Sequence, residues 1–291
     1  MAENMFHDEC NQHVFGGIWT HQKLIVLEKY LWAFTTALKK QHFKLIYVDG
    51  FAGTGRCDIK VDGERKSIEG SAKIALRTNP PFDQYFFIEL FPKKRKALQE
   101  LAQEYPEKDI RIVDVDCNIA LTKLCKGVDW GKSRAVLFLD PYGLHVEWST
   151  LKVIADTRSI DLWYLFPYAG LYRQAPKDAD ALDSDKEAAI TRILGTEEWR
   201  QEFYRQPKQQ DIFGKDGEER GASHQDMLDY VTKRLNEIFP AVLSPKVLYQ
   251  LGDGTNASGA PLFALYFAAS NPEPKAQGLA IKIAKDVLKA L

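Results

Sequence analysis

A strand pattern that runs directly into a glycine-rich loop constrains this chain more than any other feature. The apolar run 45–48 closes in Asp49, and three glycines follow within six positions: Gly50, Gly53 and Gly55. Glycine lets the backbone turn sharply and lets a ligand lie against the main chain. A strand followed by such a loop opens many nucleotide-binding α/β units. The stretch predicts a nucleotide-type ligand, against the alternative of a tight strand-to-helix turn that binds nothing.

The charge balance gives no support to a surface that binds nucleic acid, and the cysteines argue against a zinc site or a disulfide framework. The 39 Lys and Arg residues nearly match the 40 Asp and Glu residues, for a net charge of -1, whereas proteins that hold nucleic acid through its phosphates are usually basic in at least one domain. The four cysteines are scattered without a Cys-x-x-Cys pair, so we predict neither a zinc site nor a disulfide framework. We expect no metal centre, and we interpret the basic run 93–96 as a solvated helix face.

The distribution of apolar residues gives an expectation for the location of the protein. No apolar stretch approaches the roughly 20 residues that a membrane-spanning helix needs, and the acidic N-terminus shows no signal-peptide pattern. We therefore expect a cytoplasmic protein without membrane contact.

Strands alternate with helices over the first half of the chain. After the first strand, strand patterns recur at 85–88, 110–113, 135–139 and 160–166, with helical periodicity between them. Such alternation predicts an α/β fold with a mostly parallel sheet and right-handed crossovers.

The second half of the chain departs from this alternation. Residues 172–239 are polar, charged and helical, and we interpret them as a helical insertion within a single domain that spans 1–291. Two strands are then predicted at 246–251 and 262–268. The connection 252–260 is short, which requires the two strands to form an antiparallel hairpin.

A parallel sheet that ends in an antiparallel hairpin resembles the Rossmann-like fold of S-adenosylmethionine-dependent methyltransferases. The loop from Asp49 to Gly55 is similar to the first cofactor motif of that fold, and Glu89 follows the second strand where the fold places the acid for the ribose hydroxyls. Asp116 and Asn118, after the third strand, are similar to the segment that faces the adenine. Asp114 is the alternative to Asp116 for this role, and the spacing to Asn118 favours Asp116. The resemblance implies that S-adenosylmethionine is the cofactor, bound by Asp49, Gly50, Ala52, Gly53, Gly55, Glu89, Asp116 and Asn118.

A narrower resemblance rests on three features of the N-terminal half. The heptapeptide 49–55, the preceding amphipathic helix with Lys23 and Tyr30, and the pair Gly70-Ser71 together resemble the three-Cys-motif partner protein family. Members of that family are methyltransferase-like and are often paired in genomes with a three-cysteine-motif protein. The resemblance implies such a protein as a partner.

The strongest strand, 135–139, ends in Asp140-Pro141-Tyr142-Gly143. This motif occupies the place of the Asp/Asn-Pro-Pro-Tyr/Phe motif of amino-group methyltransferases, without its second proline, and is similar to the motif of tRNA guanine-N2 methyltransferases. Asp140 and the Pro141 carbonyl could accept the hydrogens of an amine, and Tyr142 could stack on a base. The resemblance implies catalytic roles for these three residues, against the alternative that Asp140 merely stabilises a turn.

These patterns predict methyl transfer to a nitrogen, on a nucleobase or a similar amine, and therefore allow a nucleic-acid substrate. Two alternatives stay open at this point. One is a small-molecule or protein methyltransferase, which the near-neutral charge suits equally well. The other is a non-catalytic partner of a three-cysteine-motif protein.

Overall fold

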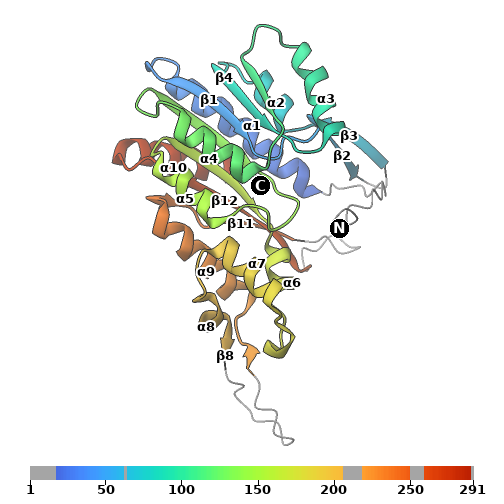
Figure 1. Ribbon diagram of the computed structural model, residues 1–291. Helices are drawn as coiled ribbons and strands as arrows, with labels where there is room; N and C mark the ends of the chain where they lie inside the picture. Colours follow the sequence, from blue (N-terminus) through green and yellow to red (C-terminus); the bar gives the residue numbers. More distant parts are fainter. Residues whose placement is uncertain (1–17, 62–63, 206–217, 250–258, 290–291) are drawn as a thin grey trace, which may run out of the picture.

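The computed structural model describes residues 18–61, 64–205, 218–249 and 259–289 (Figure 1). An eight-stranded central sheet has the order β10-β12-β7-β6-β1-β4-β5, and β11 also pairs with β12. The bounds of these strands are β1 Lys44–Asp49, β4 Gln84–Ile88, β5 Ile110–Val113, β6 Ser133–Leu139, β7 Ile160–Phe166, β10 Ala241–Val242, β11 Lys246–Tyr249 and β12 Pro261–Ala269.

The pairing of the strands confirms the predicted fold class. β1 is parallel to β4 and β6, β4 to β5, and β6 to β7. β12 instead runs antiparallel to β7, β10 and β11. The terminal antiparallel pair predicted from the sequence is therefore present, and most of its connection, 250–258, lies outside the described residues.

Alternating side chains on the strands separate two core layers, because successive residues of a strand point to opposite faces. In β1, Leu45 and Tyr47 pack in the layer of α1, α2, α3 and α10. Ile46 and Val48 pack in the layer that contains α4 to α9. The helix bounds are α1 Ile18–Leu38, α2 Ser71–Arg77, α3 Pro92–Gln103, α4 Cys117–Gly127, α5 Trp148–Asp156 and α10 Pro274–Leu288.

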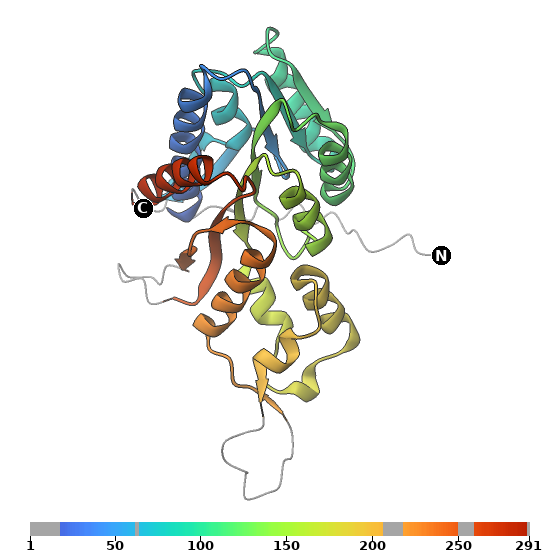
Figure 2. The same cartoon turned by 90° about the vertical axis from the view of Figure 1, so that its left-hand side faces the viewer.

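The segment between β7 and β10 carries further helices. They are α6 Tyr168–Gln174, the 3-10 turn η1 Ala179–Ala181, α7 Ser184–Leu194, α8 Trp199–Phe203 and α9 His224–Ile238, with the short pair β8 Tyr204–Arg205 and β9 Glu219–Arg220. Both views show α7, α8 and α9 at one end of the molecule, away from α2 and α3 (Figures 1 and 2). The description of 172–239 as an insertion within one domain stays a prediction.

A small hairpin interrupts the connection from the glycine loop to its helix. β2 (Arg56–Val61) and β3 (Glu64–Glu69) pair antiparallel, and the Gly70 amide donates to the Gly55 carbonyl at 2.8 Å. Neither strand is predicted from the sequence. The missed indications are the alternation of apolar and charged residues along 57–61 and the Asp-Gly dipeptide at 62–63, which is a strong hairpin pattern.

In the described part of the chain, no helix is both long and apolar enough to cross a bilayer.

Candidate functional site

The candidate site lies where the order of the strands reverses direction. From β1 the chain proceeds to β4 and β5 on one side, and it then returns to β6 and β7 on the other side. β1 and β6 are parallel neighbours, and the Gly50 amide donates to the Phe138 carbonyl at 2.9 Å. Asp49 and Asp140 therefore end adjacent strands at one edge of the sheet. In open α/β sheets, ligands bind in the crevice at such a position.

Asp49 is fully buried beneath the glycine loop. Its carboxylate accepts hydrogen bonds from the Phe51 amide at 3.2 Å and from the Tyr47 hydroxyl at 3.2 Å. Burial raises the pKa of Asp49 to about 6, even though hydrogen bonds from the Ser71 hydroxyl and the Phe51 amide lower it. The first residue of α2 thus contacts the acid that closes β1, across the inserted hairpin.

Some of the predicted loop residues are packed against the core, and one faces open space. A Cβ on Gly50 would collide with the Leu139 side chain, and Ala52 is buried with 4% exposure. Gly53 has a φ of 64°, and a Cβ placed there would meet nothing within 4 Å. Gly53 is therefore the position where the loop turns its bare backbone toward free space.

Glu89 joins the end of β4 to the glycine loop. Its Oε2 accepts from the Gly53 amide at 3.0 Å and its Oε1 from the Phe91 amide at 2.9 Å, and its exposure is 4%. A carboxylate oxygen can accept more than one hydrogen bond. Glu89 consequently fixes the loop and retains acceptor capacity beside Gly53.

Asp116 and Asn118 hold the end of β5 and the start of α4. Asp116 caps α4 by accepting from the Asn118 amide at 2.9 Å. The Asn118 side chain donates to the His145 carbonyl at 2.9 Å and accepts from the Glu147 amide at 3.0 Å. Both residues lie at the edge of the sheet formed by the carboxyl ends of the parallel strands. The side-chain amide of Asn118 connects this segment to the loop that follows β6.

Asp140 forms an ion pair that the sequence analysis did not anticipate. The Lys23 ammonium, on α1, contacts Oδ2 of Asp140, and the two side chains are 9% and 26% exposed. Burial raises the pKa of the nearby Cys57 thiol, the Lys23 charge lowers it, and Asp140 and Asp49 raise it further. The hairpin strand β2 thus passes close to both aspartates. The ion pair between Lys23 and Asp140 joins residues that are far apart in the sequence, so no sequence motif predicts it.

The residues after Asp140 differ in exposure. Pro141 is buried, whereas Tyr142 is 57% exposed. Partial burial of its hydroxyl and the charges of Glu89 and Asp140 raise the pKa of Tyr142. Three further apolar side chains at this edge of the sheet are about half exposed: Leu90 at 55%, Phe91 at 51% and Ile119 at 50%.

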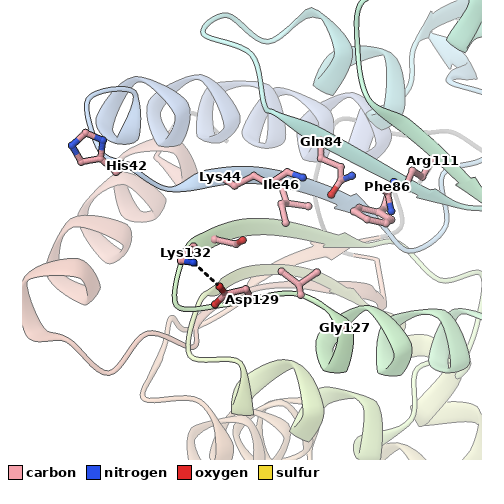
Figure 3. A pocket seen from close by; sticks show the side chains of 11 residues that line it. His42, Lys44, Ile46, Gln84, Phe86, Arg111, Gly127, Asp129 and Lys132 are labelled. Carbon is pink, nitrogen blue, oxygen red and sulfur yellow. Dashed lines mark ion pairs between the residues drawn. The ribbon is translucent and has the colours of Figure 1, made fainter.

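A hollow at the opposite edge has a different character. About 490 Å³ of space lies between the amino ends of β1, β4 and β6 and the end of α4, lined by residues that include Lys44, Gln84 and Gly127 (Figure 3). Asp129 and Lys132 pair at its rim at 3.6 Å. None of the site residues predicted from the sequence lines it, and ligands of parallel sheets bind at the other ends of the strands.

Within the described ranges, no group of three or more His, Cys, Asp or Glu side chains is arranged to hold a metal ion. A tetrahedral structural site would need four such ligands.

No protein-family model and no curated protein sequence matches this chain. Among solved structures it is similar to protein LPL1258 of Legionella pneumophila strain Philadelphia 1, assigned to family DUF519. The TM-score is 0.50 at 11% identity, with 92% of this chain and 91% of that chain covered. That likeness shows a shared fold over nearly the whole chain.

Two weaker likenesses are to proteins described as binding S-adenosyl compounds. One is an S-adenosylmethionine-dependent methyltransferase of Clostridium acetobutylicum, with a TM-score of 0.35, 11% identity, and 83% of this chain and 91% of that chain covered. The other is the N-terminal domain of EvdMO1 with SAH bound, with a TM-score of 0.36, 11% identity, and coverage of 84% and 80%. The strand order and the likeness to LPL1258 show a Rossmann-like α/β fold whose mostly parallel sheet ends in an antiparallel pair.

Proposed function

We propose that this protein is an S-adenosylmethionine-dependent methyltransferase that acts on an amine nitrogen of a nucleobase or a similar group. One observation carries the proposal: the bare backbone of Gly53, the carboxylate of Glu89 and the carboxylate of Asp140 all lie at the point where the strand order reverses. The first two fit a nucleoside cofactor, and the third fits an amine acceptor.

The cofactor half of the site consists of the glycine loop and the ends of β4 and β5. Glu89 has acceptor capacity for ribose hydroxyls, and Gly53 leaves space against the main chain. Leu90 and Ile119, which follow β4 and open α4, offer exposed apolar surface for an adenine ring. S-adenosylmethionine bound here would supply an electrophilic methyl group.

The acceptor half consists of Asp140, Pro141 and Tyr142. An exocyclic amine shares its lone pair with the ring, so acceptors of its hydrogens make the nitrogen more nucleophilic. Asp140 uses Oδ2 for Lys23, and Oδ1 and the Pro141 carbonyl are assigned to the amine hydrogens. Asp140 and the Pro141 carbonyl would hold the nitrogen in line with the methyl carbon that S-adenosylmethionine supplies. The new nitrogen–carbon bond would replace the carbon–sulfur bond of the cofactor, S-adenosylhomocysteine would leave as a neutral thioether, and the amine proton would pass through Oδ1 of Asp140 to solvent.

The resemblance to the three-Cys-motif partner family adds a proposal about a binding partner. A three-cysteine-motif protein encoded beside this chain would associate with it, whether or not that protein receives the methyl group. Co-expression of the two chains followed by size-exclusion chromatography tests this point. Elution of the two chains in separate peaks at micromolar concentration contradicts it.

The enzyme proposal is tested first by titration calorimetry with S-adenosylmethionine. Lack of binding at millimolar cofactor contradicts the proposal. Where binding is seen, radiolabelled methyl transfer to total RNA, DNA and protein fractions distinguishes nucleobase methylation from protein methylation.

A variant of the acceptor half then separates the two halves. Asp140→Ala should reduce methyl transfer by about 100-fold or more, which is a typical loss when an oriented catalytic group is removed, and it should change cofactor affinity less than threefold. Asp129→Ala, which removes an exposed acid at the opposite edge of the sheet, is the matched control. Large loss of cofactor affinity in Asp140→Ala contradicts its assignment to the acceptor half.

A further inference from the structure

Two exposed aromatic rings and a cluster of cations lie next to the acceptor half of the site. Phe91 precedes α3, Tyr142 follows β6, and both rings are more than half exposed. Between them lies Lys94, whose Nζ is 5.0 Å from the Phe91 ring centroid and 4.2 Å from the Tyr142 ring centroid. Lys94 also donates a hydrogen bond to the Tyr142 hydroxyl. One ammonium thus links the end of β4 with the end of β6.

The sequence around Lys94 is strongly basic. Lys93, Lys94, Arg95 and Lys96 are consecutive, and the first turn of α3 contains no acid. Arg95 is directed toward Asp114, 3.9 Å away, and toward the Leu90 carbonyl at 3.3 Å. Lys93 and Lys96 are exposed. The interpretation of this run as merely a solvated face overlooked that one of its members contacts the residue two positions after Asp140.

We propose that Phe91, Lys93, Lys94, Lys96 and Tyr142, here called the α3 patch, bind the strand of a single-stranded nucleic acid that presents the methyl acceptor. This inference rests on the proposed function and names its substrate class. Exposed rings offer stacking faces to successive bases, and neighbouring cations pair with the phosphates, which is how single strands are held without sequence preference. The phosphates and the flat bases of a single strand match both features of this surface at once.

The contacts of Lys94 indicate how the α3 patch responds to its ligand. The Lys94 ammonium lies close enough to both ring centroids for a favourable cation–π interaction, while both rings remain more than half exposed. A base that stacks on Tyr142 displaces this ammonium, which is then free to pair with the adjacent phosphate. Because the acceptor amine must reach Asp140, a base in a duplex would first have to leave its stack, so single strands should bind more tightly.

The test measures fluorescence anisotropy of a labelled 15-nucleotide RNA, the same DNA sequence and its duplex, titrated with the full chain between 50 and 200 mM salt. The triple variant Lys93→Glu, Lys94→Glu, Lys96→Glu should weaken single-strand binding by at least about tenfold at 100 mM salt. Each lost phosphate contact should also reduce the slope of log affinity against log salt by about 0.7. Acidic residues suit the start of a helix, so the variant should fold.

The matched control is Lys275→Glu, Lys282→Glu, Lys285→Glu, which makes the same charge change on exposed positions of α10. It should alter binding less than threefold. Equal weakening by the two triple variants overturns the proposal, and so does wild-type affinity for single strands weaker than about 1 mM. Tyr142→Ala, which keeps every charge, should weaken binding by about tenfold through lost stacking, and no change there also overturns it.

Calorimetry with S-adenosylmethionine on the same samples separates this inference from the proposed function. Cofactor binding without single-strand binding contradicts the α3 patch alone. Single-strand binding without cofactor binding contradicts the methyltransferase proposal, and with it the assignment of the strand as methyl acceptor. Methyl transfer to an acidic peptide but not to RNA or DNA overturns the α3 patch as a nucleic-acid surface.

Discussion

The end of β1 holds a fully buried aspartate, Asp49, and the start of β7 holds a half-buried one, Asp161, each with a pKa of about 6. Burial is the largest cause in both cases, and a tyrosine hydroxyl donates to each carboxylate, Tyr47 to Asp49 and Tyr30 to Asp161. Asp161 even lines a cavity of about 360 Å³. By titration alone the two positions would be equally good candidates for a functional site.

Their surroundings separate them. Asp49 lies at the carboxyl end of its strand, beneath a glycine with open space beside it, and within the electrostatic influence of Asp140. Asp161 lies at the amino end of its strand, where the Arg134 charge lowers its pKa and the Tyr30 ring packs against Trp163. Because ligands of open α/β sheets bind at the carboxyl ends of the strands, only the raised pKa at the end of β1 accompanies a candidate ligand site.

The largest loss of cofactor affinity should come from a side chain placed in the open space at the carboxyl edge of the sheet. A side chain placed at the amino edge should cause no such loss. Gly53→Val should weaken S-adenosylmethionine binding by about 100-fold or more, equivalent to about 2.7 kcal/mol. Its side chain would occupy the space at the loop, and a β-branched residue is strained at the φ of 64°. Gly127→Val is the control, since Gly127 also faces open space and lines the hollow at the amino edge. Calorimetry measures the cofactor affinity of both variants. Comparable losses of affinity would contradict the assignment of the cofactor site to the carboxyl edge.

The two aspartates should contribute alike to the pH dependence of stability but not to cofactor binding. Each pKa is raised from 3.8 to about 6, so the stabilising effect of the bound proton is complete below about pH 4 and is lost as the pH rises through 6. For fully buried Asp49 the loss is about 3 kcal/mol. Urea unfolding of Asp49→Asn and Asp161→Asn between pH 4 and 7 should show a flatter profile in each.

Calorimetry then distinguishes the two asparagine variants. Only Asp49→Asn should change cofactor affinity, by several fold, because Asp49 positions the glycine loop through the Phe51 amide. An affinity change in Asp161→Asn with none in Asp49→Asn would reverse the assignment of the two regions.

The smallest change in cofactor affinity is expected for Gly50→Ala. This variant tests whether Gly50 is needed for packing of the loop or for binding of the cofactor. Gly50→Ala places a Cβ against the Leu139 side chain and close to Cys117 Sγ, and overpacking of this kind costs about 1–3 kcal/mol of unfolding free energy. Thermal unfolding measures this loss. Cofactor affinity of the folded variant should stay within threefold of wild type, and a larger drop would place Gly50 on the ligand side of the loop.

Much of the fold was predictable because it follows from local pattern. The apolar strands 85–88, 110–113, 135–139 and 160–166 are each present, and the final strands pair antiparallel as their short connection requires. The hairpin of β2 and β3 was not predicted because its strands carry many charged residues and form no continuous apolar run. The alternation of charged residues with Cys57 and Ile59 is the strand pattern that was overlooked.

The candidate site was predictable only where its residues stand beside strand ends. Asp49, Glu89 and Asp140 each follow a strong strand, so their common edge follows from parallel pairing. The position of a side chain on a separate helix follows from no such rule. Lys23 and Lys94 are distant in sequence from Asp140 and Tyr142, and only the packing of α1 and α3 beside the sheet brings them together.

The amino-acid sequence by itself determined the strand-to-loop turn at Asp49, the alternation of elements and the antiparallel ending, because these depend on local conformational preference and on the period of apolar residues. The tertiary structure alone decided which glycine is packed and which faces open space, which of the two aspartates with a raised pKa lies at a ligand-binding edge, and which lysines reach the acceptor motif. Those outcomes depend on distances between elements, and such distances are fixed only when the two core layers close on the sheet.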